Sequence, residues 1–197
     1  IKPNQLFITS ESQGTILARL QEQCDVMGAR MIVVPDYQVS RYPFHFRYRD
    51  MAFTLHHQGI YQVTNARLAL TIASKLIKMQ GDITTKAVEE TTWRGRYETL
   101  SYKDSEVSID GAHNIPGIEA LIQTLSVKKD KNVSIIFSCL NDKNMDTMLD
   151  MLLKHNYTVY LTSFHDERAI DVSQMKSHDN LIIIEDFKEA IQTAYLK

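Results

Sequence analysis

The sequence predicts an α/β fold with a parallel sheet in its carboxy-terminal half. Short apolar runs alternate with amphipathic helical segments from residue 107 to residue 194. These runs are nearly continuous, as in strands that helices cover on both faces. Residues 6–10 and 31–34 form two further apolar runs typical of buried strands, with a helical segment between them. Such a strand–helix–strand unit favours a parallel pair.

The helix of this first unit is predicted from the apolar residues at helical spacing between Ile16 and Cys24. A serine at position 10 or 12 is placed to cap its start, because a hydroxyl oxygen can accept from the first free amides. Gly28 is placed to end it, since glycine adopts the left-handed conformation at little cost.

Residues 42–55 show a different pattern, in which the aromatic Phe44, Phe46 and Tyr48 alternate with basic residues. A period of two predicts a strand with one solvated face, at the edge of a sheet. A face that stacks RNA bases is the alternative, because aromatic and basic residues interleave in such sites. No wider basic patch accompanies this strand, so the edge strand is the favoured interpretation.

Residues 63–79 predict a strongly amphipathic helix, with Gly81 stopping it and a short helix at about 84–90 following. The alternation beyond residue 107 predicts a Rossmann-like domain, with strands at 107–110, 134–138, 157–162 and 181–184 and helices at 118–125, 148–153 and 187–194. We therefore place a domain boundary close to Trp93, giving domains 1–92 and 93–197.

Composition and charge narrow the possible partners. The net charge of the 197-residue chain is −2, so it offers no global basic field for nucleic acid or an anionic membrane. No apolar run approaches the ~20 residues that span a bilayer. Cys24 and Cys139 lie in apolar surroundings without metal-ligand spacing, as expected for buried thiols in a reducing cytoplasm. These observations favour a cytoplasmic protein that binds small molecules.

Asp110 is the most informative single position. It is predicted to end the first strand of the parallel sheet, at the edge where α/β sheets bind ligands. His113 and Asn114 precede a helix that Pro116 is placed to begin, and a helix N-terminus favours anions. The carboxylate of Asp110 can bind ribose hydroxyls or a metal-associated water. The alternative is that Asp110 and Asn114 are only turn and capping residues.

Arg96, Gln62 and Asn65 are the other candidates. A guanidinium chelates phosphate oxygens through two parallel hydrogen bonds, although Arg96 can equally be a surface residue or an ion-pair partner of Glu98. Gln62 and Asn65 stand at the entry to the helix over 63–79. Their amides can recognise a purine edge or cap that helix, and capping is the simpler interpretation.

Three segments taken in order resemble a known series of motifs, namely Gly59-Ile60-Tyr61-Gln62-Val63-Thr64-Asn65-Ala66, Trp93-Arg94-Gly95-Arg96-Tyr97-Glu98 and Asp110-Gly111-Ala112-His113-Asn114. They are similar to the G-x-H-Q-x-x-N-A, W-P-G-R-x-E and D-G-A-H-N-P motifs of folylpolyglutamate and dihydrofolate synthases, members of the Mur ligase superfamily. Residues 137–144, 162–169 and 1–3 resemble further segments of that family. The resemblance covers nearly the whole chain.

The resemblance implies an ATP-dependent ligase that adds L-glutamate to folates through an acyl phosphate. It implies that Gln62 and Asn65 contact the nucleotide from a central ATP-binding domain. It also implies that Arg96 reaches the phosphates and that Asp110 and Asn114 hold the nucleotide. His113 would lie near the reacting phosphate or the incoming glutamate. ATP and Mg²⁺ are the implied cofactors, with the metal ligands expected outside this chain and none within it.

The sequence departs from the family pattern at Tyr61, Arg94 and Ile115, which replace His, Pro and Pro. It also contains no G-x-x-x-x-G-K-[ST], the loop that cradles ATP phosphates. We therefore expect a carboxy-terminal fragment that is inactive by itself, from an enzyme that is a monomer at full length. A non-catalytic nucleotide- or partner-binding module and a peptidoglycan-precursor Mur ligase are the two alternatives.

Overall fold

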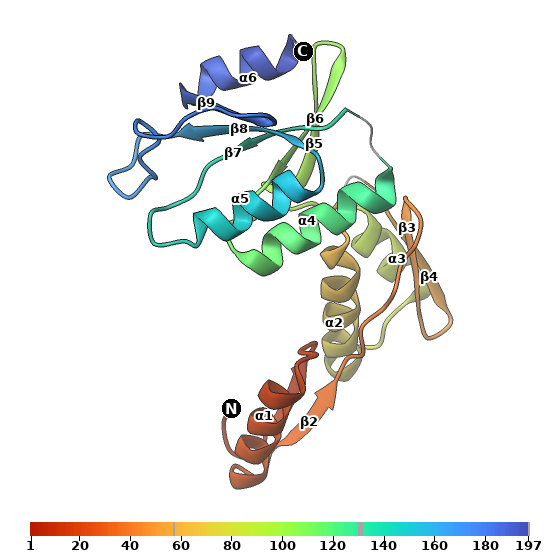
Figure 1. Cartoon of the computed structure of the whole chain (residues 1–197). Coiled ribbons are helices and arrows are strands. Elements are labelled where there is room, and N and C mark those ends of the chain that lie inside the picture. The colour runs from red at the N-terminus through yellow and green to blue at the C-terminus, as the bar shows by residue number, and fades with distance from the viewer. Residues whose placement is uncertain (57, 130–131, 197) are drawn as a thin grey trace. The chain divides into compact units, whose positions relative to one another are not determined.

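The computed structural model describes residues 1–56, 58–129 and 132–196 (Figure 1). The chain divides into two compact units, Ile1–Trp93 and Arg94–Lys197. We call them the amino-terminal unit and the carboxy-terminal unit and describe each by itself. Among the residues that the structure describes, no helix combines the length and the apolar character needed to cross a bilayer.

The amino-terminal unit begins with strand β1 (Leu6–Thr9), helix α1 (Gly14–Val26) and strand β2 (Arg30–Val33). The two strands pair in parallel, as their strand–helix–strand order predicts. The strands are only partly covered, so the prediction that they are buried was wrong.

The start of helix α1 differs from the prediction, whereas its end agrees with the prediction. Its N-cap is Gln13, which makes no side-chain capping bond, so neither Ser10 nor Ser12 caps it. Gly28 has φ +60, and the amides of Gly28 and Ala29 donate to the carbonyls of Asp25 and Cys24. These two bonds form the motif in which a left-handed glycine closes a helix.

The hairpin of β3 (Phe44–Tyr48) and β4 (Met51–Leu55) follows. The alternation predicted for this segment is present, because Phe44 and Phe46 are buried while His45 and Arg47 are exposed. Phe46 stacks on Phe53 across the hairpin with ring centroids 4.9 Å apart. The other face of β3 is exposed to solvent, as predicted for this strand.

Helices α2 (Tyr61–Leu76) and α3 (Gly81–Glu89) complete the amino-terminal unit. Helix α2 ends where Ile77 turns extended, at φ −137 and ψ 158. The prediction that Gly81 stops this helix was wrong, since Gly81 is the first residue of α3. The break falls four residues earlier, within a segment that carries no glycine or proline signal.

The carboxy-terminal unit opens with an antiparallel hairpin of β5 (Arg96–Tyr102) and β6 (Ser105–Asp110). The expected strand at 107–110 is therefore present, but the prediction that it begins the parallel sheet was wrong. Its side chains alternate Glu-Val-Ser-Ile, and all four are exposed, whereas a strand inside a doubly covered sheet carries a nearly continuous apolar run. Sequence reasoning missed β5 altogether.

The parallel sheet of this unit contains β7 (Ser134–Phe137), β8 (Thr158–Ser163) and β9 (Leu181–Asp186) in that spatial order. Figure 1 shows α4 (Ile115–Lys128) and α5 (Met145–Lys154) on one face and α6 (Phe187–Tyr195) on the other. This Rossmann-like arrangement confirms the predicted fold class. Its core joins helix and strand residues that include Ile118, Phe137, Met148, Leu152, Val159 and Leu161.

Both cysteines are free thiols, and both are buried, as predicted. Cys24 is fully covered on α1, and Cys139 is 4% exposed just after β7. Burial raises the pKa of the Cys139 thiol, and the nearby Asp142 carboxylate raises it further.

Candidate functional site

The motif that contains Arg96 and the motif that begins with Asp110 lie side by side, because they belong to the paired strands β5 and β6. Arg96, the first residue of β5, is the register partner of Asp110, the last residue of β6. Fourteen positions separate them in the sequence, and the hairpin brings their backbones side by side. A cation and a carboxylate thus share one end of a small sheet, where phosphate and hydroxyl groups of a ligand can be bound together.

Two glycines let the backbones approach closely at this end. The amide of Gly111 donates to the carbonyl of Gly95 at 2.8 Å, and Gly95 adopts φ +67. A Cβ added at Gly111 would lie 3.2 Å from the Gly95 oxygen and 3.3 Å from Nη1 of Arg96. The Arg96 guanidinium therefore lies directly over the Gly111 backbone, although the residue is exposed to solvent.

Glu98 closes the loop that precedes β5. Its Oε2 accepts from the Gly95 amide at 2.9 Å, while its Oε1 lies 3.9 Å from Nε of Arg94. This ion pair joins Glu98 to Arg94 rather than to Arg96, the partner considered from the sequence. Glu98 fixes the left-handed glycine, and through it the start of the strand that carries Arg96.

The turn from Asp110 to Asn114 is held by its own side chains. Asp110 Oδ1 accepts from the Ala112 amide at 2.8 Å, and Asn114 Oδ1 accepts from the Gly117 amide at 2.8 Å. Asp110 therefore stabilises the turn and Asn114 caps the helix that follows, which are the structural roles of the alternative interpretation. His113 Nδ1 lies 2.6 Å from the Gly111 carbonyl. A carbonyl only accepts, so Nδ1 donates and the neutral ring keeps Nε2 as its acceptor nitrogen.

Helix α4 starts directly from this turn, with Asn114 as N-cap and Pro116 in its first turn, as predicted. A Cβ added at Gly117 would lie 3.0 Å from Asn114 Oδ1 and 3.2 Å from Cα of Ala112. Glycine at position 117 therefore allows the helix to begin tight against the turn. The positive end of the α4 dipole lies beside the Asp110–Asn114 segment.

Replacing Asn114 by alanine removes the acceptor that caps α4. The expected result is a loss of about 1 kcal/mol in the free energy of unfolding, measured by urea denaturation. Asn114→Asp is the matched control, because aspartate keeps an acceptor oxygen and suits a helix N-terminus. Equal losses in the two variants would show that the cap does not stabilise the helix.

Gln62 and Asn65 lie in the amino-terminal unit, in the first turn of α2. Asn65 Nδ2 donates to Gln62 Oε1 at 2.8 Å. The N-cap of α2 is Ile60, and it makes no side-chain capping bond, so capping does not explain the two amides. Their joint action with Arg96 on one nucleotide stays a prediction.

Sequence reasoning gave no role to two loops that follow β7 and β8. Leu140 bridges Ala169, and the Asn141 amide donates to the Arg168 carbonyl at 2.7 Å. Arg168 also pairs with Asp166 at 3.2 Å, and its side-chain hydrogen bond holds the Asp166 pKa below the usual range. Both segments had been noted for their resemblance to family motifs. Their positions after adjacent parallel strands would have placed them at the same sheet edge.

The carboxy-terminal unit matches the model of a known family. The model described as Mur ligase, glutamate ligase domain, matches residues 95–197. The dihydrofolate synthase/folylpolyglutamate synthase of Bacillus subtilis is 30% identical over 117 residues, which cover 56% of this chain and 27% of that protein. The protein of the same description from Mycobacterium tuberculosis is 30% identical over 161 residues, covering 75% of this chain and 32% of its own length.

Solved structures give the same fold over nearly the whole chain. M. tuberculosis folylpolyglutamate synthase complexed with ADP and AMPPCP aligns with a TM-score of 0.81 at 22% identity, covering 97% of this chain and 48% of that one. Thermotoga maritima folylpolyglutamate synthase aligns with a TM-score of 0.72 at 24% identity, covering 98% and 50%. The chain thus spans about half the length of these structures and about a third or less of the two curated relatives.

Proposed function

Because this chain belongs to the Mur ligase family through its glutamate ligase domain, we propose that it forms part of an ATP-dependent ligase that adds L-glutamate to folates. The observation that carries the proposal is the pairing of Arg96 with Asp110, which unites two motifs at one sheet end. The names of the two curated relatives support folates as the acceptor class. We further expect the enzyme to act in the cytoplasm as a monomer, without nucleic-acid or membrane partners.

The residues at this end suit a nucleotide. The guanidinium of Arg96 lies over Gly111, whose missing Cβ leaves room for it, and the exposed Arg96 is available to phosphate oxygens. Asp110 and Asn114 are proposed to hold the ribose side of the nucleotide, and His113 to lie near the reacting phosphate or the incoming glutamate. In the amino-terminal unit, the paired amides of Gln62 and Asn65 are proposed to contact the base.

ATP supplies the phosphoryl group that activates a folate carboxylate, and the glutamate amine then displaces phosphate to form the amide. The residues of this chain supply a positive charge and hold it in place. Arg96 stabilises negative charge on the transferring group, and the hairpin fixes its place. Within the described residues, no group of three or more His, Cys, Asp or Glu side chains is placed to hold a metal ion.

The whole reading frame that encodes this chain tests the proposal. Expressed in a bacterium that lacks folylpolyglutamate synthase, it is expected to restore growth and the formation of folate polyglutamates. The same frame carrying Arg96→Ala is expected to fail. Transfer of glutamate to a UDP-linked peptidoglycan precursor instead of a folate would contradict the proposed substrate class.

The 197-residue chain by itself is expected to bind adenine nucleotide without catalysing ligation, since its sequence has no phosphate-cradling loop. Incubation with ATP, Mg²⁺, reduced folate and radiolabelled L-glutamate measures this directly. ATP-dependent labelling of folate by the purified chain would overturn that expectation.

A further inference from the structure

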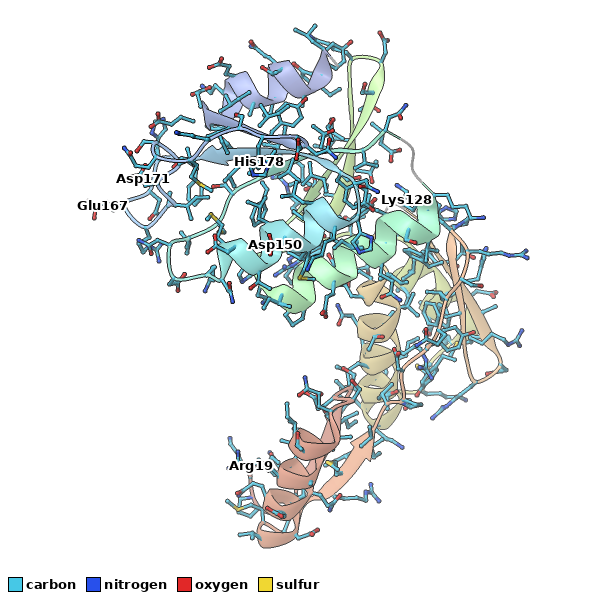
Figure 2. All side chains as sticks on the ribbon, viewed as in Figure 1. Arg19, Lys128, Asp150, Glu167, Asp171 and His178 are labelled. Atoms are coloured by element: carbon cyan, nitrogen blue, oxygen red, sulfur yellow. The ribbon has the colours of Figure 1, made fainter. Side chains whose placement is uncertain are left out.

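A nearly buried lysine contacts both strands of the hairpin that carries Arg96 and Asp110. Figure 2 shows Lys128 at the carboxy-terminal end of α4. Its side chain is only 6% exposed, and its Nζ lies 3.1 Å from Oε1 of Glu106 on β6. The same Nζ lies 5.0 Å from the centroid of the Tyr97 ring on β5. One ammonium group therefore links α4 to both strands.

Stability alone is a weak reason for this arrangement. Taking an ammonium group out of water costs free energy, and a buried ion pair is often no better than apolar side chains of similar volume. The Glu106 side chain is 54% exposed, so solvent screens its attraction for Lys128. The cation–π contact with Tyr97 is directional, because the ammonium must lie over the ring face. The contact with Lys128 therefore fixes the position of the Tyr97 ring.

Tyr97 occupies the one irregular point of the hairpin. The register shifts between Arg96 and Glu98, and Tyr97 between them has φ 55 with 1% exposure. A bulge bends its strand and re-aims the neighbouring side chains. A bulky residue at positive φ is strained and persists only when its surroundings hold it. Whatever seats the Tyr97 ring thus also sets the direction of Arg96, the residue just before it.

We propose that Lys128 is a positioning residue for the candidate site: by seating the Tyr97 bulge, it holds the Arg96 guanidinium over Gly111. Lys128 itself touches neither nucleotide nor substrate. The positioning follows from the contacts of Lys128 with the hairpin, and only its use for binding nucleotide rests on the function proposed above. Helix α4 would then support the site from both ends, since its N-terminus carries the Asn114 turn and its C-terminus carries Lys128.

The test compares three lysine variants of the full chain. Lys128→Met keeps an apolar stem and removes the charge, and Lys128→Arg keeps the charge. Lys188→Met is the matched control, because Lys188 lies 5.9 Å from the ring centroid of its neighbour Phe187 on α6, outside the hairpin. The first measurement is amide hydrogen exchange by NMR at Gly111, whose amide donates to Gly95. The second is ADP affinity by calorimetry.

Lys128→Met is expected to speed exchange at Gly111 about tenfold and to weaken ADP binding about tenfold. Amides of β8 should keep their rates, and Lys128→Arg should restore most of both properties. Lys188→Met should change neither. Equal acceleration at Gly111 and in β8 would reveal a purely structural lysine, and unchanged exchange at Gly111 would also overturn the proposal.

The exchange measurement separates this inference from the proposed function. If the wild-type chain binds no ADP while Lys128→Met still loosens Gly111 selectively, positioning stands and the nucleotide site fails. If Lys128→Met does not fold, Glu106→Gln replaces it, since that side chain is half exposed and its loss leaves the core intact. Selective loosening of Gly111 in Glu106→Gln supports the link, and its absence contradicts it.

Discussion

Replacing Arg96 by alanine is expected to weaken the binding of ADP to this chain by about tenfold to a hundredfold. Two charge-assisted hydrogen bonds from a guanidinium to phosphate oxygens are lost, and such bonds contribute about 1.5–3 kcal/mol. Isothermal titration calorimetry of the full chain measures the change. Arg96→Lys should recover only part of the affinity, because an ammonium cannot form the same two parallel bonds.

Arg94→Ala is the matched control for this prediction. Arg94 lies two residues away in the same motif, its side chain is 96% exposed, and its ion pair with Glu98 is long, at 3.9 Å. An exposed pair of this kind contributes little, so ADP affinity should change less than about threefold. Equal losses in the two variants would point to a general electrostatic effect. Undiminished affinity in Arg96→Ala would remove Arg96 from the site.

Replacing Leu152 by alanine is expected to lower the free energy of unfolding of the carboxy-terminal unit by about 3 kcal/mol. Leu152 lies on α5, is 0% exposed and belongs to the core between helices and parallel sheet. The substitution removes three carbon atoms from a closely packed interior and leaves a cavity. Exchange of the slowest β8 amides reports this quantity, since they open only on global unfolding.

Leu196→Ala provides the comparison, because Leu196 is 81% exposed at the end of the last helix. The same chemical change there should alter the free energy of unfolding by less than about 0.5 kcal/mol. A small effect at Leu152 would mean that the packing between α5 and β8 is not part of the unit's stable core.

The parallel part of the fold was predictable because its strands carry a strong signal. Residues 134–137, 158–163 and 181–184 each contain a continuous apolar run, which is typical of strands in a doubly covered sheet. The hairpin at 96–110 was not recognised, although Leu100, Val107 and Ile109 alternate with polar residues. In its turn Lys103 has φ 52, and lysine is not one of the residues whose presence predicts a left-handed turn.

The meeting of Arg96 with Asp110 lay beyond sequence reasoning for a related reason. Pairing register depends on the turn and on the bulge at Tyr97, and a bulge changes which residues face each other. The motifs themselves were sufficient to identify the family, which the match over residues 95–197 confirms. The structural roles of Asp110 and Asn114 were foreseen as turn and cap, and their ligand roles stay proposals.

The two buried cysteines have a practical consequence. Alkylating reagents need an accessible thiolate, and burial denies access while the raised pKa of Cys139 disfavours the anion. We therefore expect maleimide reagents to leave Cys24 and Cys139 of the folded chain unlabelled. A cysteine introduced at an exposed position near Arg96 would take a fluorophore without competition from Cys24 or Cys139. Such a dye would report the arrival of a nucleotide through its own emission.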